Sequence, residues 1–468
     1  MPINSFLLPG AKVTPAYEVA NSCRFNRADG PNMTKTPGSS GDLRKWTWSC
    51  WVKRGSISNG SQTMFNAGSS SNTQIRFDSD DTINFYQYNS GYTARLATNQ
   101  KFRDPTAWLH IVAHWDTDNG TAGDRMKLFV NGSEVTSFAT DTNPNQNLDS
   151  YFGASGTALY VGDKGDGAEE MDGYLAEVCF IDGQNLAPSS FGEFDEDSPT
   201  IWKPKNVSGL TFGTNGFYLD FEDSANLGND ANGGTDLTEN NIAATDQATD
   251  TPTNNFCTLN PLNSVGTAGL GTVTMSEGNL QALGTDDFDT AFGTIGVQNG
   301  VWYYEVECDS TGSGYCAGWT TTDEMQSVGA SGDLSAKFVG FLNDIRVMNW
   351  NTEELADYGS ISAGDILGLE LDLDSGTKTL KCYHNGTLKD TANLPTDKGD
   401  TWIPIIGDTG TSDPTYKLNF GNPITSLSSA VNDPNGYGSF EYSPNITGDS
   451  EAKKFYALCT KNLAEFGG

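Results

Sequence analysis

The sequence predicts an all-β protein made of two antiparallel β-sandwich domains joined by a polar linker. Short runs of alternating or aromatic residues recur along the chain and are bounded by Gly, Asn and Asp, as is typical of strands that end in tight turns. The 53 glycines occur together with abundant Asn, Thr, Ser and aromatic residues, a mixture that favours many short strands. Runs that would form helices are scarce. The 468 residues suffice for two to three domains of about 100–200 residues each.

The first sandwich is expected over residues 21–222. Its strand-like runs are WTWSCWVKRG (46–55), TINFYQY (82–88), AWLHIVAHWD (107–116), MKLFVNGSEV (126–135), ALYVGD (158–163) and GYLAEVCFID (173–182). The Asn131-Gly132 pair between apolar segments is a strong hairpin signal. These features indicate an antiparallel sandwich.

Residues 223–260 are expected to form a linker, because the segment is rich in Asn, Asp, Thr and Gly and has no aromatic residue between Glu222 and Asn255. Such a segment buries little and would let the distal domain move. The second sandwich is expected over 261–422, from the runs VWYYEVECD (301–309), YCAGW (315–319), KFVGFLN (337–343), DILGLELDLD (365–374), KTLKCYHNG (378–386) and PTYKLNFG (414–421). The remaining segment, 423–468, contains KKFYALCTKNL and is expected to pack back on one of the domains.

The charge of the chain excludes several classes of partner. Asp and Glu number 60 against 27 Lys and Arg, for a formal net charge of −33, and no basic residue lies between Lys205 and Lys337. A field of this sign repels nucleic acid and anionic lipid headgroups. No apolar stretch approaches the roughly 18 residues of a membrane-spanning helix. We therefore expect neither nucleic-acid binding nor membrane insertion.

The cysteines and the N-terminus indicate a protein made in the cytoplasm. The eight cysteines are widely spaced and form no CxxC pair, and most lie in strand-like apolar runs, where a thiol behaves as a small hydrophobe. We expect reduced, buried thiols. The N-terminal residues MPINSFLLPGAK lack a basic segment and a long apolar run, so no secretory signal is expected.

The order of these strands resembles two known families. The segments WTWSCWVKRG, WLHIVAHWD, KLFVNGSEV and DGYLAEVCFIDGQNLAPSSFG follow the pattern of the laminin-G-like, or concanavalin A-type, lectin and glucanase superfamily. The segments GVWYYEVE, GDILGLELDLDSGTKTLKCYHNG, WIPIIG and KLNFG resemble SPRY domains in order and spacing. The resemblance implies two jelly-roll-type sandwiches, both of which are binding scaffolds whose loops carry specificity.

The connecting segments DTPTNNFCTLNPL and FYALCTKNL are similar to structural proteins of marine tailed phages, including phages of cyanobacteria, which are described as virion or tail-fibre-like proteins. The resemblance implies a non-enzymatic virion protein made in the host cytoplasm and present in several copies on the particle. Its partners would be a host-surface glycan or neighbouring virion proteins. The alternatives are a purely structural decoration of head or tail and an enzyme that degrades surface polysaccharide. A bacterial adhesin would need an export signal.

Two groups of residues are candidates for catalysis, and no catalytic residue is predicted from either. Glu370, Asp372 and Asp374 share one strand face, as in the Glu-x-Asp-x-Glu strand of glucanases. The SPRY-like context and the Asp-Ser-Gly turn favour instead a structural strand with its leucines inward and its acids in solvent. His110, with Asp116 and a serine, would make a triad, but no Gly-x-Ser-x-Gly elbow accompanies it, so a structural histidine is favoured.

A calcium site is predicted in the loop before the last long strand of the first sandwich. Carboxylates crowd this loop at Asp163, Asp166, Glu169 and Asp172, with Glu170 between them. Ca²⁺ takes six to eight oxygen ligands in flexible geometry, which loop acids supply. Laminin-G-like domains often hold calcium at such a rim. A second group of loop acids lies at Asp116, Asp118 and Asp124.

Residues 1–20 are expected to form an arm that anchors the protein to the particle. Pro2, Pro9 and Pro15 argue against an inner strand. Phe6, Leu7 and Leu8 form the only apolar cluster of the segment, and their burial against a partner would stabilise docking by about 1.5–3 kcal/mol each before ordering costs. The alternative is a frayed terminus.

Overall fold

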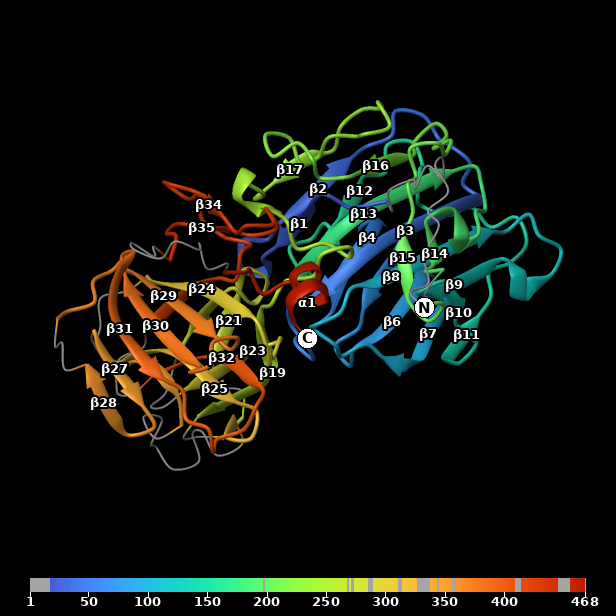
Figure 1. Cartoon of the computed structure of the whole chain (residues 1–468). Helices are drawn as coiled ribbons and strands as arrows, with labels where there is room; N and C mark the ends of the chain where they lie inside the picture. The colour runs from blue at the N-terminus through green and yellow to red at the C-terminus, as the bar shows by residue number, and fades with distance from the viewer. Residues whose placement is uncertain are drawn as a thin grey trace, which may run out of the picture.

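The computed structural model has two lobes of β-sheet, the first in blue to green and the second in yellow to red (Figure 1). It describes residues 17–467, except for 197, 267–268, 271–272, 285–288, 310–313, 326–336, 343–344, 356–358, 409–413 and 445–454. In this part of the chain, strands alternate with turns, and α1 (Thr460–Phe466) is the single α-helix. The prediction of an all-β protein with antiparallel sandwiches is confirmed.

The first sandwich consists of two eight-stranded antiparallel sheets. Sheet A contains β1 (Ser22–Phe25), β3 (Lys45–Arg54), β8 (Leu109–Asp116), β9 (Met126–Val130), β10 (Ser133–Glu134), β13 (Gly173–Asp182), β16 (Phe217–Leu219) and β18 (Gln247–Ala248). Sheet B contains β2 (Asn32–Lys35), β4 (Gln62–Gly68), β5 (Asn72–Phe77), β6 (Thr82–Tyr88), β7 (Tyr92–Lys101), β11 (Phe138–Thr142), β12 (Leu159–Val161) and β17 (Thr238–Asn240). Short 3-10 turns connect some strands at η1 (Arg27–Asp29), η2 (Ala122–Asp124), η3 (Pro188–Ser190) and η4 (Ala244–Asp246).

Alternation along β3 explains how the two sheets pack. Side chains of a strand point to opposite faces in turn, so Trp46 and Trp48 enter the core between the sheets. Trp46 meets Phe85 edge-on at 5.7 Å between ring centroids, and Trp48 stacks on Phe65 at 6.0 Å. Each large apolar side chain buried in this way contributes about 1.5–3 kcal/mol.

Sheet A is buried on its outer face as well. All ten residues of β13 are buried, because its outer face packs with Phe191, Val207 and Phe212 and with Val19 and Trp108. A hairpin of β14 (Gly192–Phe194) and β15 (Trp202–Pro204) contacts the same face of the sheet at β8. Trp202 of this hairpin stacks on His110 with 5.9 Å between ring centroids. In a sheet buried on both faces, polar side chains find most of their hydrogen-bond partners within the protein.

The linker prediction for residues 223–260 requires correction. Within this segment β17 pairs with β2 and β18 pairs with β1, so its backbone completes one edge of each sheet. Leu227 and Leu237 enter the core of the first sandwich. The polar composition of this segment predicts that it buries little, but backbone pairing and two leucines fix it to the first sandwich.

The second sandwich also consists of two antiparallel sheets. One contains β19 (Leu259–Gly266), β20 (Gly269–Leu270), β23 (Thr290–Gly293), β25 (Tyr315–Thr321), β26 (Val339–Leu342), β27 (Arg346–Asn349), β28 (Thr352–Leu355) and β32 (Trp402–Asp408). The other contains β21 (Thr274–Ser276), β22 (Gln281–Leu283), β24 (Val301–Cys308), β29 (Ile366–Asp372), β30 (Thr379–His384), β31 (Thr387–Asn393) and β33 (Thr415–Asn419). A 3-10 turn, η5 (Glu277–Asn279), precedes β22.

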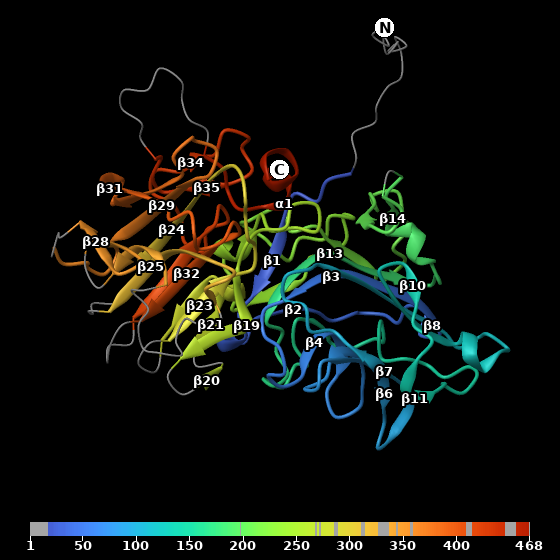
Figure 2. The same cartoon turned by 60° about the horizontal axis from the view of Figure 1, so that its bottom comes forward.

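The C-terminal segment covers the outer face of the sheet that contains β24. Phe440, in a small hairpin of β34 (Val431–Asn432) and β35 (Ser439–Phe440), packs with Phe455 against Tyr303. Tyr456 pairs with Trp302 of β24 and stacks on Phe466 of α1. In Figure 2 the helix lies between the two lobes.

Buried polar bonds fix the junction between the sandwiches. The ammonium of Lys53 donates to Asp250 at 2.6 Å, to Asn255 at 2.7 Å and to the carbonyl of Phe256 at 3.0 Å. Arg24 of β1 pairs with Glu277 of η5 at 2.9 Å. These bonds oppose the independent movement of the second sandwich that a flexible linker would allow.

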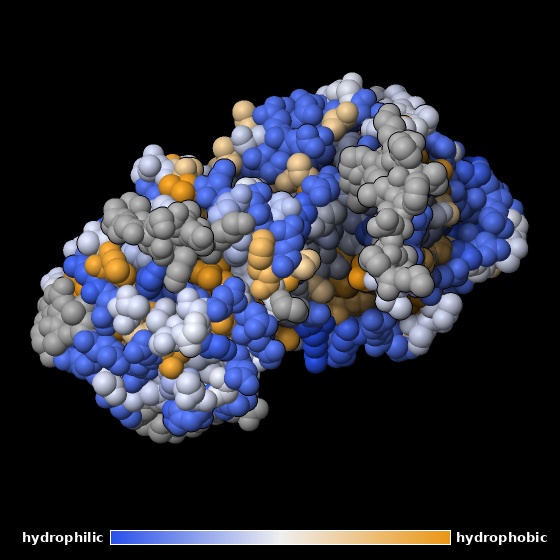
Figure 3. Space-filling model, in the orientation of Figure 1, coloured by the Kyte–Doolittle hydropathy of each residue, from blue (hydrophilic) through white to orange (hydrophobic). Residues whose placement is uncertain are grey.

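All eight cysteines are buried and free, which confirms the prediction of buried thiols. The face drawn in Figure 3 is largely hydrophilic, and its hydrophobic residues occur in small separate groups. No helix in the described ranges is long and apolar enough to cross a membrane.

The junction gives a first prediction. Lys53→Met should lower the free energy of unfolding by about 3–5 kcal/mol, because it leaves Asp250 buried without its cation. Lys101→Met is the matched control: its pair with Asp80 is 45 % and 58 % exposed and should contribute less than about 1 kcal/mol. Urea unfolding of both variants measures the difference. Equal midpoints would contradict a structural role for the pair.

Candidate functional site

A polar cleft lies at the edge of the first sandwich, between the end of β2, the loop before β16 and the loop before β17. Its volume is about 540 Å³, and residues 34–38, 213–216 and 232–238 contribute to its walls. Ligand sites generally measure about 300–1,000 Å³. The cleft is therefore large enough for a small molecule or for part of a polymer.

Hydroxyl and amide groups dominate the lining of this cleft. They belong to Thr34, Thr36, Thr214, Asn215, Asn232, Thr235 and Thr238. Each of these groups both donates and accepts hydrogen bonds. Among the described residues that line the cleft, the only charged ones are Lys35 and Asp236.

The ammonium of Lys35, a residue that lines the cleft, is held by one long ion pair. Lys35 Nζ lies 3.5 Å from Oδ2 of Asp230 and 5.6 Å from the ring centroid of Phe217. The Asp230 side chain is wholly buried; its Oδ1 accepts from the N–H groups of Tyr218 and Asn232. Within the described part of the chain, Asp230 is the only polar partner of Lys35. Since an ammonium has three donors, Lys35 retains the capacity to donate to a ligand.

The loop before β16 is fixed by bonds to the body of the sandwich. Asn215 donates its backbone N–H to Asp182 at 2.9 Å and its side-chain amide to the carbonyl of Gly153 at 3.0 Å. Gly213 has φ 79°, and a Cβ there would lie 2.1 Å from the carbonyl oxygen of Asp182. Only glycine permits this close approach.

The loop before β17 is fixed by its own carboxylates. Asp236 accepts from the N–H of Asp230 at 3.0 Å and from the side chain of Asn226 at 2.9 Å. These backbone and side-chain N–H donors hold the pKa of Asp236 below its ordinary value. A Cβ at Gly234 would lie 2.2 Å from Oδ2 of Asp230. The cleft therefore has preformed walls, with an ionised carboxylate at its rim.

Sequence reasoning missed this cleft. Residues 232–238 fell within the segment interpreted as a linker, and residues 213–216 follow the last strand-like run recognised in the first sandwich. Gly, Asn and Thr were clustered in both places, which indicated turns. Nothing local to the sequence indicated that β17 would pair with β2 and bring the two loops together.

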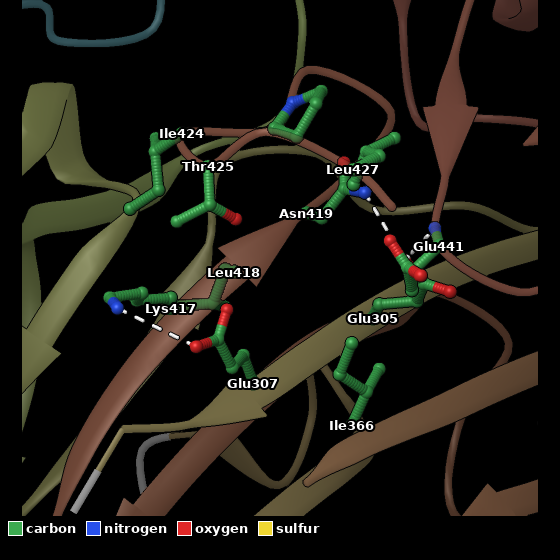
Figure 4. Close-up of a pocket in the computed structure, with 11 residues that line it drawn as sticks. Glu305, Glu307, Ile366, Lys417, Leu418, Asn419, Ile424, Thr425, Leu427 and Glu441 are labelled. Carbon is green, nitrogen blue, oxygen red and sulfur yellow. Dashed lines mark hydrogen bonds and ion pairs between the residues drawn. The ribbon is translucent and has the colours of Figure 1, made fainter. Parts of the chain in front are cut away.

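The pocket shown in Figure 4 belongs to the second sandwich and is much smaller, at about 20 Å³. This is roughly the space of one water molecule. Glu305 at its wall accepts from the N–H groups of Glu441 and Tyr442, both at 2.8 Å, and burial raises the pKa of Glu305 to about 7. The carboxylate therefore serves as an anchor for the C-terminal segment.

Glu370 and Asp372 of β29 are buried, although the sequence predicted that the acids of this strand lie in solvent. Glu370 is 1 % exposed, and it accepts from Lys381 and from the hydroxyl of Tyr383, each at 2.9 Å. Asp372 accepts from Ser375, and Asp374 accepts from the N–H of Gly300. The C-terminal segment covers this sheet face, so the expectation of solvent exposure was wrong for Glu370 and Asp372. It is confirmed for Asp374, which is exposed, and Leu369, Leu371 and Leu373 lie in the core as expected.

His110 is a structural histidine in a fixed tautomer. Trp202 Nε1 lies 3.0 Å from Nδ1 of His110, and Ser49 Oγ lies 2.8 Å from Nε2. Indole N–H only donates, so Nδ1 must accept and the proton of the neutral ring sits on Nε2. Burial lowers the pKa of His110 to about 3. His110 thus donates to Ser49 and has no free lone pair with which to act as its base. Asp116 lies six residues along the same strand, about 20 Å away.

The structure does not gather the acids predicted to bind calcium. Glu169 pairs with Arg76 at 2.7 Å and accepts from Gln74, whereas Asp166 pairs with Lys164 at 2.9 Å. Burial raises the pKa values of Asp163 and Asp172. Among the described residues, no group of three or more His, Cys, Asp or Glu side chains is arranged to hold a metal ion. Calcium binding therefore stays a prediction without geometric support. The arm residues Phe6, Leu7 and Leu8 lie outside the described residues.

Comparison with known proteins agrees with the lectin-like first sandwich. Residues 29–184 match the family described as the concanavalin A-like lectin/glucanases superfamily, of the laminin-G type. No curated protein matches. Solved structures similar to the chain include the SPRY domain of human HERC1, at 14 % identity and a TM-score of 0.26, with 34 % of this chain and 96 % of that chain covered.

Two further solved structures are similar in fold. A native heptameric SAP-like pentraxin from Limulus polyphemus has 16 % identity and a TM-score of 0.28, with 36 % of this chain and 80 % of that chain covered. A candidate carbohydrate-binding protein from Bacteroides ovatus has 14 % identity and a TM-score of 0.32, with 48 % of this chain and 59 % of that chain covered. Likenesses at this level bear on the fold alone.

A buried carboxylate on the outer face of sheet A holds the N-terminal end of the described chain. Glu177 lies in a β-bulge of β13, at φ 50°, and accepts from the hydroxyls of Tyr17 and Tyr218, each at 2.9 Å. Burial raises its pKa to about 7. Because the pKa lies near 4.5 in the unfolded chain, the native state binds the proton more tightly.

Stability should therefore fall as the pH rises from 4.5 to 7, and the full penalty should be present above pH 7. For Glu177 alone this amounts to about 3 kcal/mol. Relative to Glu177→Gln, the wild-type protein should lose about this much unfolding free energy between pH 4.5 and pH 8 in urea titrations. Glu134→Gln, at a residue whose side chain is 43 % exposed, is the control. Parallel curves for wild type and Glu177→Gln would refute the assignment.

Proposed function

We propose that the chain is a non-enzymatic surface-binding protein that recognises a saccharide through the cleft of its first sandwich. The observation that carries this proposal is the 540 Å³ cleft lined by hydroxyl and amide side chains on preformed loops. Saccharide hydroxyls donate and accept in the same way as these groups. A site built to hydrogen-bond hydroxyls discriminates strongly against molecules that lack them.

The candidate acid and base have their hydrogen-bonding groups occupied by partners within the protein, and this supports binding over catalysis. Glu370 is held by Lys381 and Tyr383 beneath the C-terminal segment, and the tautomer of His110 is fixed by Trp202. A glycosidase needs a carboxylate pair at the substrate. A polysaccharide-degrading enzyme of the concanavalin A-like superfamily is the second candidate.

We further propose that the protein is part of a phage virion, as a tail-fibre-like or decoration protein that attaches the particle to a host-surface glycan or to neighbouring virion proteins. The resemblance of DTPTNNFCTLNPL and FYALCTKNL to marine phage proteins supports this role. The cleft favours host attachment over a purely structural decoration, because decoration alone needs no ligand site.

The glycan proposal is tested by screening the full chain on an array of marine and bacterial polysaccharides and measuring hits by calorimetry. Lys35→Met and Thr235→Val should each weaken binding at least tenfold, which corresponds to the loss of about 1.4 kcal/mol from a hydrogen bond. Lys127→Met, outside the cleft, should leave affinity unchanged. Absence of any glycan binding would contradict the proposal, and release of reducing ends that Glu370→Ala abolishes would favour the enzyme.

The virion proposal predicts that mass spectrometry of purified particles detects this chain. Deleting residues 2–12 should leave two folded sandwiches, because the described strands of both sandwiches begin at Ser22 or later, and should abolish incorporation into particles. Normal incorporation of the truncated chain would refute the role of Phe6, Leu7 and Leu8 as an anchor. Absence of the full chain from particles would refute the virion role itself.

A further inference from the structure

The charges of the cleft point to one class of saccharide. We infer that the cleft accepts uncharged, hydroxyl-rich saccharides and rejects sulfated or uronic-acid saccharides, and that Lys35 and Asp236 together set this selection. The inference rests on the proposed function and narrows its ligand.

The positive charge of Lys35 is already matched within the protein. Its ammonium pairs with Asp230 at 3.5 Å, and the Asp230 side chain has no exposed area. An arriving sulfate or carboxylate would therefore compete with a fixed internal carboxylate for Lys35. The N–H groups of Tyr218 and Asn232 hold Oδ1 of Asp230, and Gly234 approaches its Oδ2 closely, so this counter-charge is kept beside Lys35.

Asp236 adds a second carboxylate, and this one is exposed at the rim. The bonds from the Asp230 N–H and the Asn226 side chain keep it in place. Lys35, Asp230 and Asp236 sum to one negative charge. The whole chain adds a field of the same sign, since its formal net charge is −33.

The hydrogen-bonding capacities of Lys35 and Asp236 favour neutral saccharides, as the charges of the cleft do. Lys35 only donates, whereas the carboxylate of Asp236 only accepts. A sugar hydroxyl accepts from the ammonium and donates to the carboxylate, so neighbouring hydroxyls satisfy both residues. A sulfate or carboxylate group accepts hydrogen bonds but donates none. It would repel the carboxylate of Asp236 and supply no hydrogen bond to it.

The test compares matched saccharide pairs that differ only in charge. The probes are desulfated and native κ-carrageenan hexasaccharides, laminarihexaose and its sulfated derivative, and carboxyl-reduced and native alginate hexamers. In every pair that binds the full chain at about 10 mM ionic strength, where screening is weak, the neutral member should bind at least tenfold more tightly. At about 0.5 M salt the ratio of the neutral to the charged affinity should fall toward one, because the charges are then screened.

Two variants separate the roles of the two residues. Asp236→Asn removes the charge at the rim and should reduce the ratio of the two affinities to about threefold or less, because the charged member no longer faces a carboxylate. Lys35→Met should weaken both members. A charged member that binds as tightly as its neutral partner to the wild-type protein overturns the inference and leaves saccharide binding intact. Absence of binding by all six probes, together with an empty polysaccharide array, overturns the proposed function itself.

Discussion

The arrangement of the two sandwiches depends on the buried ion pair between Lys53 and Asp250. Lys53 lies on a central strand of sheet A, and Asp250 follows β18, the last strand of the first sandwich; their side chains are at most 1 % exposed. A buried ammonium is tolerated only where its donors find acceptors. Asp250, Asn255 and the carbonyl of Phe256 supply them, so the chain passes from one sandwich to the other in a defined conformation.

The same requirement governs the outer face of sheet A, where two apolar clusters exclude water. Two titratable groups on this face are tied to specific partners: His110 to Ser49 and Trp202, and Glu177 to Tyr17 and Tyr218. Groups bound in this way specify structure and are poorly placed to react with a ligand. A serine, a histidine and a glutamate on adjacent strands therefore form a structural network.

The sequence predicts those features of the fold that depend on neighbouring residues, and it does not predict those that depend on contacts between distant segments. The strands β3, β8 and β13 follow from their own alternation, and the buried cysteines follow from their apolar surroundings. The pairing of β17 with β2 could not be inferred, because two leucines and backbone bonds outweigh a composition that resembles a linker. The burial of Glu370 could not be inferred either, because it depends on a C-terminal segment that folds back over β29.

The cleft differs from these networks in the state of its polar groups. Its threonines and Asn232 line open space. Among the described residues Lys35 has one polar partner, at 3.5 Å, whereas Lys53 has three acceptors within 3.0 Å. Both lysines lie beside a buried aspartate, so burial alone does not account for the contrast. The difference is that the acceptors of Lys53 come from the chain itself, while those of Lys35 would come from a ligand. Donors left unused on rigid loops cost little in water and are already oriented for binding. In this fold, therefore, the capacity for recognition lies where the internal hydrogen bonding of the sandwich is incomplete.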